Sequence, residues 1–63
     1  MQKWEYKQVV VDRGVLLESA EDGTLVRSEE TIVVLCLNKL GNKGWELVTS
    51  TDVGWYWLKR PKP

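Results

Sequence analysis

The 63-residue sequence contains no histidine, no phenylalanine and a single cysteine, Cys36. One cysteine cannot form an internal disulfide, and without histidine the chain lacks the usual ligand set of a structural zinc site. Catalysis by a thiol also needs a neighbouring base, normally histidine, to maintain the thiolate. We therefore expect no enzyme activity, no metal and no cofactor, and we expect Cys36 to be inert among its apolar neighbours.

An excess of charge and a long hydrophobic run are also missing. The 9 basic and 9 acidic residues cancel, so the chain has no summed field to concentrate nucleic acid or an anionic membrane surface. The longest apolar run, Ile32 to Leu37, is far shorter than the ~20 residues that span a bilayer. The N-terminus has no signal-peptide core, and the lone cysteine agrees with a reducing compartment. We expect a cytoplasmic protein without a membrane partner.

The acidic clusters do not suggest a catalytic or cation site. Glu18, Glu21 and Asp22 fall in a predicted loop region, and Glu29 and Glu30 fall at a predicted helix start. Water reaches both places, so these carboxylates are expected to be solvated or to interact with the helix dipole. No glycine-rich loop precedes a helix as phosphate binding requires. We identify no small-molecule substrate.

What the sequence does contain is a set of short strand patterns around one helix. Residues 4–11 are rich in aromatic and β-branched types, with Trp4, Tyr6 and Val10 on one face at period two. Residues 45–50 and 55–60 also read as strands; Trp55 and Trp57 alternate with Tyr56 and Leu58. Residues 15–27 are ambiguous, because Asp22-Gly23 lies between apolar pieces. They fit either an added hairpin or a loop.

The helix is expected to begin at Ser28 and end near Leu40. Ser28 can accept an orphan amide, and Gly41 is expected to provide a left-handed C-terminal cap. One apolar stripe runs along this helix, and it consists of Val33, Cys36, Leu37 and Leu40. Ile32, Val34 and Leu35 spread the apolar surface further around the cylinder than one sheet face can cover.

These elements predict a single α+β domain over residues 1–63 in β-α-β-β order. Its sheet would be three-stranded and mainly antiparallel, with a possible extra hairpin in 15–27 and one helix on one face. A right-handed crossover through the helix would make the first two strands parallel, with the closing strand between them and antiparallel to both. A meander with the closing strand at an edge is the alternative.

Three motifs in the chain are similar to those of a known protein family. They are Trp4-Glu5-Tyr6-Lys7, the segment Leu37-Asn38-Lys39-Leu40-Gly41-Asn42-Lys43-Gly44-Trp45-Glu46-Leu47-Val48, and Lys59-Arg60-Pro61. Together the motifs resemble the small prokaryotic family known as domain of unknown function 4177, over nearly the whole chain except residues 12–31. The resemblance implies a fold but no activity, ligand or catalytic residue. The middle motif reads physically as a folding device, in which Gly41 and Gly44 turn the chain from helix to strand.

A core this small rarely supplies more than ~3–5 kcal/mol, so a partner subunit is the stabilising device that remains. We expect a non-catalytic structural or protein-interaction module that self-associates, with a dimer favoured. Nucleic acid is the alternative partner, because single-stranded bases stack on aromatic side chains beside cations. The candidate interface or binding residues lie on the helix and the closing strand, and they are Val34, Leu35, Trp55, Tyr56, Trp57, Leu58, Lys59 and Arg60.

Overall fold

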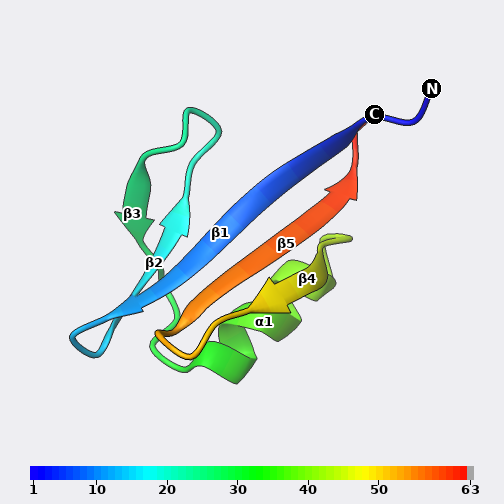
Figure 1. The fold of residues 1–63 in the computed structure, drawn as a ribbon. Helices are drawn as coiled ribbons and strands as arrows, with labels where there is room; N and C mark the ends of the chain where they lie inside the picture. Colours follow the sequence, from blue (N-terminus) through cyan, green and yellow to red (C-terminus); the bar gives the residue numbers. More distant parts are fainter. Residues whose placement is uncertain (63) are drawn as a thin grey trace.

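The computed structural model describes residues 1–62, so the last residue of the predicted domain lies outside the described part. The described chain forms five strands and one helix, in the order β1 (Trp4–Asp12), β2 (Val15–Ser19), β3 (Leu25–Arg27), α1 (Val33–Gly41), β4 (Glu46–Ser50) and β5 (Trp55–Pro61). All strands join one antiparallel sheet in the spatial order β3-β2-β1-β5-β4. The first and last strands lie side by side at its centre, with the termini close together (Figure 1).

The predicted fold class is wrong, because the sheet has five strands and not three, and two strands more than expected precede the helix. Residues 15–27 form the hairpin β2–β3 that the sequence left open, and this hairpin extends the sheet beyond β1. The closing strand β5 does lie between β1 and β4, antiparallel to both. The helix therefore connects an edge strand, β3, to the opposite edge strand, β4.

The β1–β2 connection explains how the sheet gains its extra strands. Asp12 pairs with Val15, and the two residues between them have positive φ, 52° at Arg13 and 79° at Gly14. Positive φ at both loop positions is the geometry of a type I′ turn, whose twist matches that of the flanking strands. The chain consequently reverses directly into β2 instead of entering a loop.

The helix begins later than predicted. Ser28 donates its amide to the Leu16 carbonyl at 2.8 Å, so its backbone still follows the sheet. The Ser28 hydroxyl accepts the Glu30 amide at 3.1 Å in a local turn. The N-cap is Ile32, in extended conformation and without a side-chain cap. At the other end, Gly41 is the last helical residue, and the left-handed glycine is Gly44 with φ 92°.

The core lies between the helix and one face of the sheet. Its buried members are Val9, Leu16, Cys36, Leu40, Trp45 and Leu58, with Val11, Val33, Leu37 and Tyr56 packed around them. The predicted helical stripe of Val33, Cys36, Leu37 and Leu40 is confirmed. In β4 the predicted alternation fails, because a bulge shifts the register between Leu47, opposite Leu58, and Thr49, opposite Trp57.

Candidate functional site

The pairing register shows which side chains share each face of the sheet. Directly opposed residues of antiparallel strands lie on the same face. Val9 opposes Tyr56 and Lys7 opposes Leu58, and these belong to the face that carries the helix. Gln8 opposes Trp57 and therefore lies on the other face. Within residues 1–62 the only helix packs on the first face, so no element of the described chain covers the second.

The uncovered face is dominated by large apolar side chains. We call it the aromatic face and define it by Trp4, Tyr6, Val10, Leu17, Leu25, Trp55 and Trp57, which the register places together. Tyr6 is 65% exposed and the three tryptophans are 37–44% exposed. Val10 is buried although no element covers it, because it lies between Trp55 and Leu17 on the neighbouring strands. Val10, Trp55 and Leu17 therefore pack side by side on this face.

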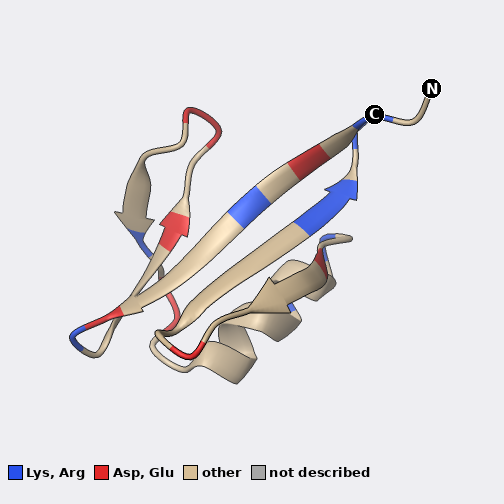
Figure 2. Ribbon diagram, viewed as in Figure 1, with Lys and Arg blue, Asp and Glu red and all other residues tan. Residues whose placement is uncertain are grey.

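Charged groups on the aromatic face are few and balanced. Lys59 lies opposite Tyr6 and Glu46, and its Nζ lies over the Trp4 ring, 4.3 Å from the ring centroid. Arg27 opposes Leu17 at one side of the sheet, and Asp12 ends β1 on the same face as Val10. Figure 2 shows that β1 and β5 carry most of their charges in the half nearest the termini, and the other half is largely uncharged.

The structure divides the predicted interface residues into three groups. Trp55, Trp57 and Lys59 belong to the aromatic face. Tyr56, Leu58 and Arg60 point to the helix side, where Leu58 is 2% exposed and belongs to the core. Val34 and Leu35 are exposed on the helix together with Ile32, and we call these three residues the helix flank. The predicted set is therefore not one surface.

Sequence reasoning left Trp4 and Tyr6 out of the candidate interface, although they contribute two of the four rings of the aromatic face. Their period-two spacing with Val10 was a usable signal that they share a face. The spacing could not show which strand lies beside β1 and extends that face. Trp4 and Tyr6 become part of one surface with Trp55 and Trp57 only because β1 pairs with β5, whose residues come about 50 positions later in the chain.

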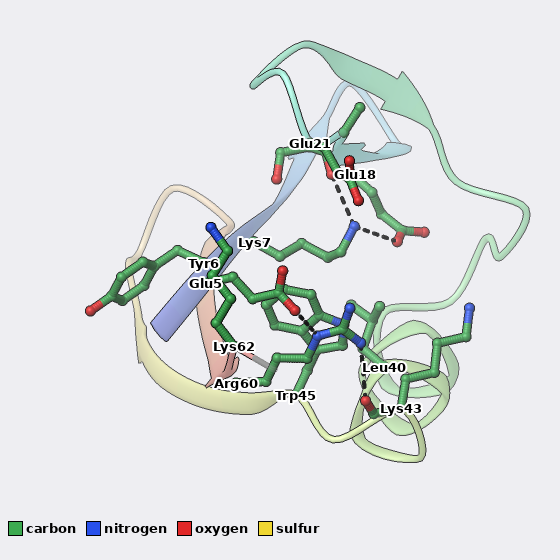
Figure 3. A pocket seen from close by; sticks show the side chains of 12 residues that line it. Glu5, Tyr6, Lys7, Glu18, Glu21, Leu40, Lys43, Trp45, Arg60 and Lys62 are labelled. Carbon is green, nitrogen blue, oxygen red and sulfur yellow. Dashed lines mark hydrogen bonds and ion pairs between the residues drawn. The ribbon is translucent and has the colours of Figure 1, made fainter. Parts of the chain in front are cut away.

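A polar hollow of about 550 Å³ lies on the helix side, between β1, β2 and the end of α1 (Figure 3). The Arg60 guanidinium lies over the Trp45 ring at 4.3 Å, and the Lys7 ammonium is 5.6 Å from the same ring centroid. Tyr6 points away from the hollow (Figure 3). The floor of the hollow is therefore the Trp45 indole, which these two cations cover.

The two cations over the Trp45 ring already have partners. Arg60 donates Nε–H to the Glu5 carboxylate and a second N–H to the Lys43 carbonyl at 3.1 Å. Lys7 donates to the Ser19 carbonyl at 2.9 Å and lies 4.0 Å from Glu18. In residues 1–62 no buried side-chain nitrogen or oxygen lacks a hydrogen-bond partner. These contacts tie β1, β2, β5 and the helix end together, and they occupy the two cations that lie over the Trp45 ring.

Cys36 is 1% exposed in the core, and its Sγ lies 3.8 Å from the Ser28 hydroxyl and 3.8 Å from a Glu18 carboxylate oxygen. Burial is the main cause that raises the pKa of the Cys36 thiol, and the negative charge of Glu18 adds to it. A raised pKa keeps the group as a neutral thiol, whereas a nucleophile needs the thiolate. The geometry therefore gives Cys36 a packing role.

Within residues 1–62 no three His, Cys, Asp or Glu side chains converge as a metal-binding group. The same residues contain no helix with the length and hydrophobicity needed to traverse a membrane. Comparison of the chain with protein-family models, curated proteins and solved structures gives no match.

Proposed function

We propose that this chain is a non-catalytic cytoplasmic module whose function is to associate with a second copy of itself. The observation that supports the proposal is the aromatic face, on which four rings remain 37–65% exposed. Contiguous apolar patches of this kind mark interaction surfaces, because monomeric proteins rarely leave them in water. The buried neutral thiol of Cys36 and the absence of histidine from the sequence support the non-catalytic part.

The total surface of the subunit supports the same proposal. Its accessible area is 4817 Å² for a mass of 7.3 kDa. A folded monomer of that mass exposes about 4,200 Å², so this subunit exposes roughly 600 Å² more than its size predicts. A standard protein interface covers about 800 Å² of each partner. Association with one other copy would therefore remove a surplus of about the observed size.

Light scattering coupled to size-exclusion chromatography tests the proposal directly. We expect a mass of two chains at micromolar concentration, and dissociation on dilution if the interface is of standard size. The elution position alone would not suffice, because the subunit is elongated, with extents of 39 × 22 × 22 Å. A strict monomer across the micromolar range would contradict the proposed function.

Single-stranded nucleic acid is the second candidate partner, and the exposure of Trp55 and Trp57 beside Lys59 favours it. Exposed rings offer stacking platforms for bases, and a nearby cation can contact phosphate. The structure weakens this candidate because it separates the basic cluster of the closing strand. Arg60 turns to the helix side and pairs with Glu5, and Lys59 already lies over Trp4.

Tryptophan fluorescence titrated with oligonucleotides at low salt tests this second candidate. Stacking on Trp55 or Trp57 would quench their emission, and rising salt would reverse the effect if phosphate contacts contribute. Poly-dT and poly-dA of equal length provide a comparison, because stacking tolerates every base. A flat response at low salt would reject nucleic acid as the partner.

A further inference from the structure

We infer that two copies bury their aromatic faces against each other, so that the assembly is a four-layer sandwich in the order helix, sheet, sheet, helix. This inference rests on the proposed self-association and adds the surface and the geometry. The subunit offers three kinds of surface that could meet a second copy: the two free edges of the sheet, the helix flank and the aromatic face. These surfaces differ in the regularity of their backbone hydrogen-bonding groups, in their exposed apolar area and in their charge.

The free edges of the sheet are poorly suited to pairing. An added strand needs a regular row of free amide and carbonyl groups. In β4 the register is broken between Leu47 and Thr49, in the middle of a five-residue strand. Bulges of this kind at sheet edges interrupt the ladder and discourage edge-to-edge association. The opposite edge, β3, has only three residues. Continuation of the sheet into a second copy is therefore disfavoured at both ends.

The helix flank is apolar but small. Ile32, Val34 and Leu35 are three aliphatic side chains at the beginning of a nine-residue helix. They present no aromatic side chain, the type that dominates interface energetics. Such a patch can contribute to a larger contact, but it is far from the area that a standard interface buries.

The aromatic face supplies a large part of the area that a standard interface needs. A fully exposed aromatic side chain presents about 200 Å², so the exposed parts of its four rings amount to roughly 400 Å². That is about half of the ~800 Å² that a standard interface covers on each partner. Leu25, which is 45% exposed, and the partly exposed Leu17 add to this area on the β2–β3 side.

The charges of this face suit contact with an identical face. Two positive groups, Lys59 and Arg27, and two negative groups, Glu46 and Asp12, share it, so two copies can meet without net repulsion. A two-fold axis makes such a contact self-complementary and closed. Two twisted sheets would then pack about 10 Å apart with their strands roughly 30° from parallel.

Trp57 occupies the middle of the proposed contact. It lies opposite Gln8 of the central strand β1, with Trp55 and Val10 forming the next pair on this face. Residues near the centre of an interface, and tryptophan above all, account for most of the binding energy. Because Trp57 is outside the core, its replacement should disturb association more than folding.

Analytical ultracentrifugation of the full chain and three variants tests the inference. We expect Trp57→Thr and Tyr6→Lys each to weaken the dimer about tenfold or more, with the circular dichroism spectrum retained. Leu35→Gln, on the helix flank, is the matched control and should leave the dimer unchanged. Tyr6 is the more exposed residue, so Tyr6→Lys gives the answer if Trp57→Thr fails to fold.

Acrylamide quenching of tryptophan emission gives an independent readout. In the dimer Trp4, Trp55 and Trp57 should be shielded, and Tyr6→Lys should make them more accessible to the quencher. If Leu35→Gln dissociates the dimer while Tyr6→Lys does not, the inference is overturned and the proposed self-association stands. If the unmodified chain is a monomer at every concentration, the proposed function itself fails.

Discussion

The role of each tryptophan depends on the face of the strand or turn that holds it. Trp45 is 9% exposed at the helix end, where Arg60 and Lys7 cover its ring. Trp4, Trp55 and Trp57 point to the aromatic face. The same residue type therefore supports the fold at one position and forms the candidate interface at three others. Substitutions that change only the stability of the fold can be distinguished by experiment from substitutions that change only association.

Gly54 provides one test of local geometry. Its φ is 86°, and an added Cβ would lie 3.2 Å from the Val11 Cβ. Its carbonyl also accepts the Val11 amide at 2.9 Å, so the backbone cannot move away easily. We expect Gly54→Ala to lower the free energy of unfolding by about 1–3 kcal/mol, measured by urea denaturation.

The matched control for this substitution is Gly23→Ala. Gly23 has a similar φ of 90°, but nothing lies within 4 Å of an added Cβ there. The Gly23→Ala variant should lose about 1 kcal/mol of unfolding free energy, because only the left-handed backbone conformation is unfavourable there. An equal loss of stability in the two variants would contradict the role of the Val11 contact.

Cys36 should make stability depend on pH in the alkaline range. Burial raises the pKa of its thiol in the folded state, so the unfolded chain loses this proton at lower pH than the folded chain does. The contribution of Cys36 to stability is therefore complete below the unfolded thiol pKa of about 8.5 and is lost as pH rises through the folded pKa.

Urea denaturation at neutral pH and at a pH above the unfolded thiol pKa, with Cys36→Ala as the control, measures this effect. The unsubstituted chain should lose more stability with rising pH than the variant does. The native thiol should also react slowly with a disulfide reagent and quickly in urea, because the attacking species is the thiolate. Fast reaction of the native protein would show that Cys36 is not shielded.

Among the elements, the two hairpins that include β2 account for the main difference between the expected and observed folds. The β2–β3 turn is held by Asp22, whose carboxylate accepts the Thr24 amide at 3.0 Å and the Thr24 hydroxyl at 2.7 Å. These bonds lower the pKa of Asp22. The β1–β2 turn instead places Arg13 at positive φ, which is unfavourable for this residue type.

We therefore expect Arg13→Asn to stabilise the protein by about 0.5–1 kcal/mol. Asparagine followed by glycine is the preferred sequence of a type I′ turn, because asparagine tolerates the left-handed conformation. Arg13→Val should have the opposite effect, since a β-branched side chain is strongly disfavoured at positive φ. Thermal unfolding of the two variants at equal concentration measures both. A destabilising Arg13→Asn would contradict the turn assignment.

Residues 1–62 form one sheet with a helix on one face only, and this one-sided arrangement explains the large surface of the subunit for its mass. The radius of gyration of 11.4 Å slightly exceeds the ~10.6 Å typical of a chain this long. A second layer over the aromatic face would give the sheet two covered faces. In the proposed assembly this layer comes from the second copy.

If folding and association are linked, the melting temperature should rise with protein concentration. Binding of a partner to the folded state alone stabilises it by mass action. We expect this rise for the unmodified chain and for Leu35→Gln in differential scanning calorimetry, and a much smaller rise for Tyr6→Lys. A melting temperature independent of concentration in the unmodified chain would show that association does not contribute to its stability.

Sequence alone determined the local patterns. Alternation in residues 4–11 and 55–60 identified the two central strands and the residues that share each face, because strand side chains alternate whatever they pack against. The spacing of Val33, Cys36, Leu37 and Leu40 identified the buried stripe of the helix for the same kind of reason. The Asp22-Gly23 signal allowed for the hairpin without deciding it.

Only the tertiary structure decided which apolar face is core and which is uncovered. Both faces of β5 are apolar, with Tyr56 and Leu58 on one and Trp55 and Trp57 on the other, so no periodicity could indicate which of them the helix covers. The helix start was misplaced because the Ser28 amide bonds to Leu16, a contact between residues 12 positions apart. Local propensity depends on neighbours along the chain, whereas burial depends on segments that only folding brings together.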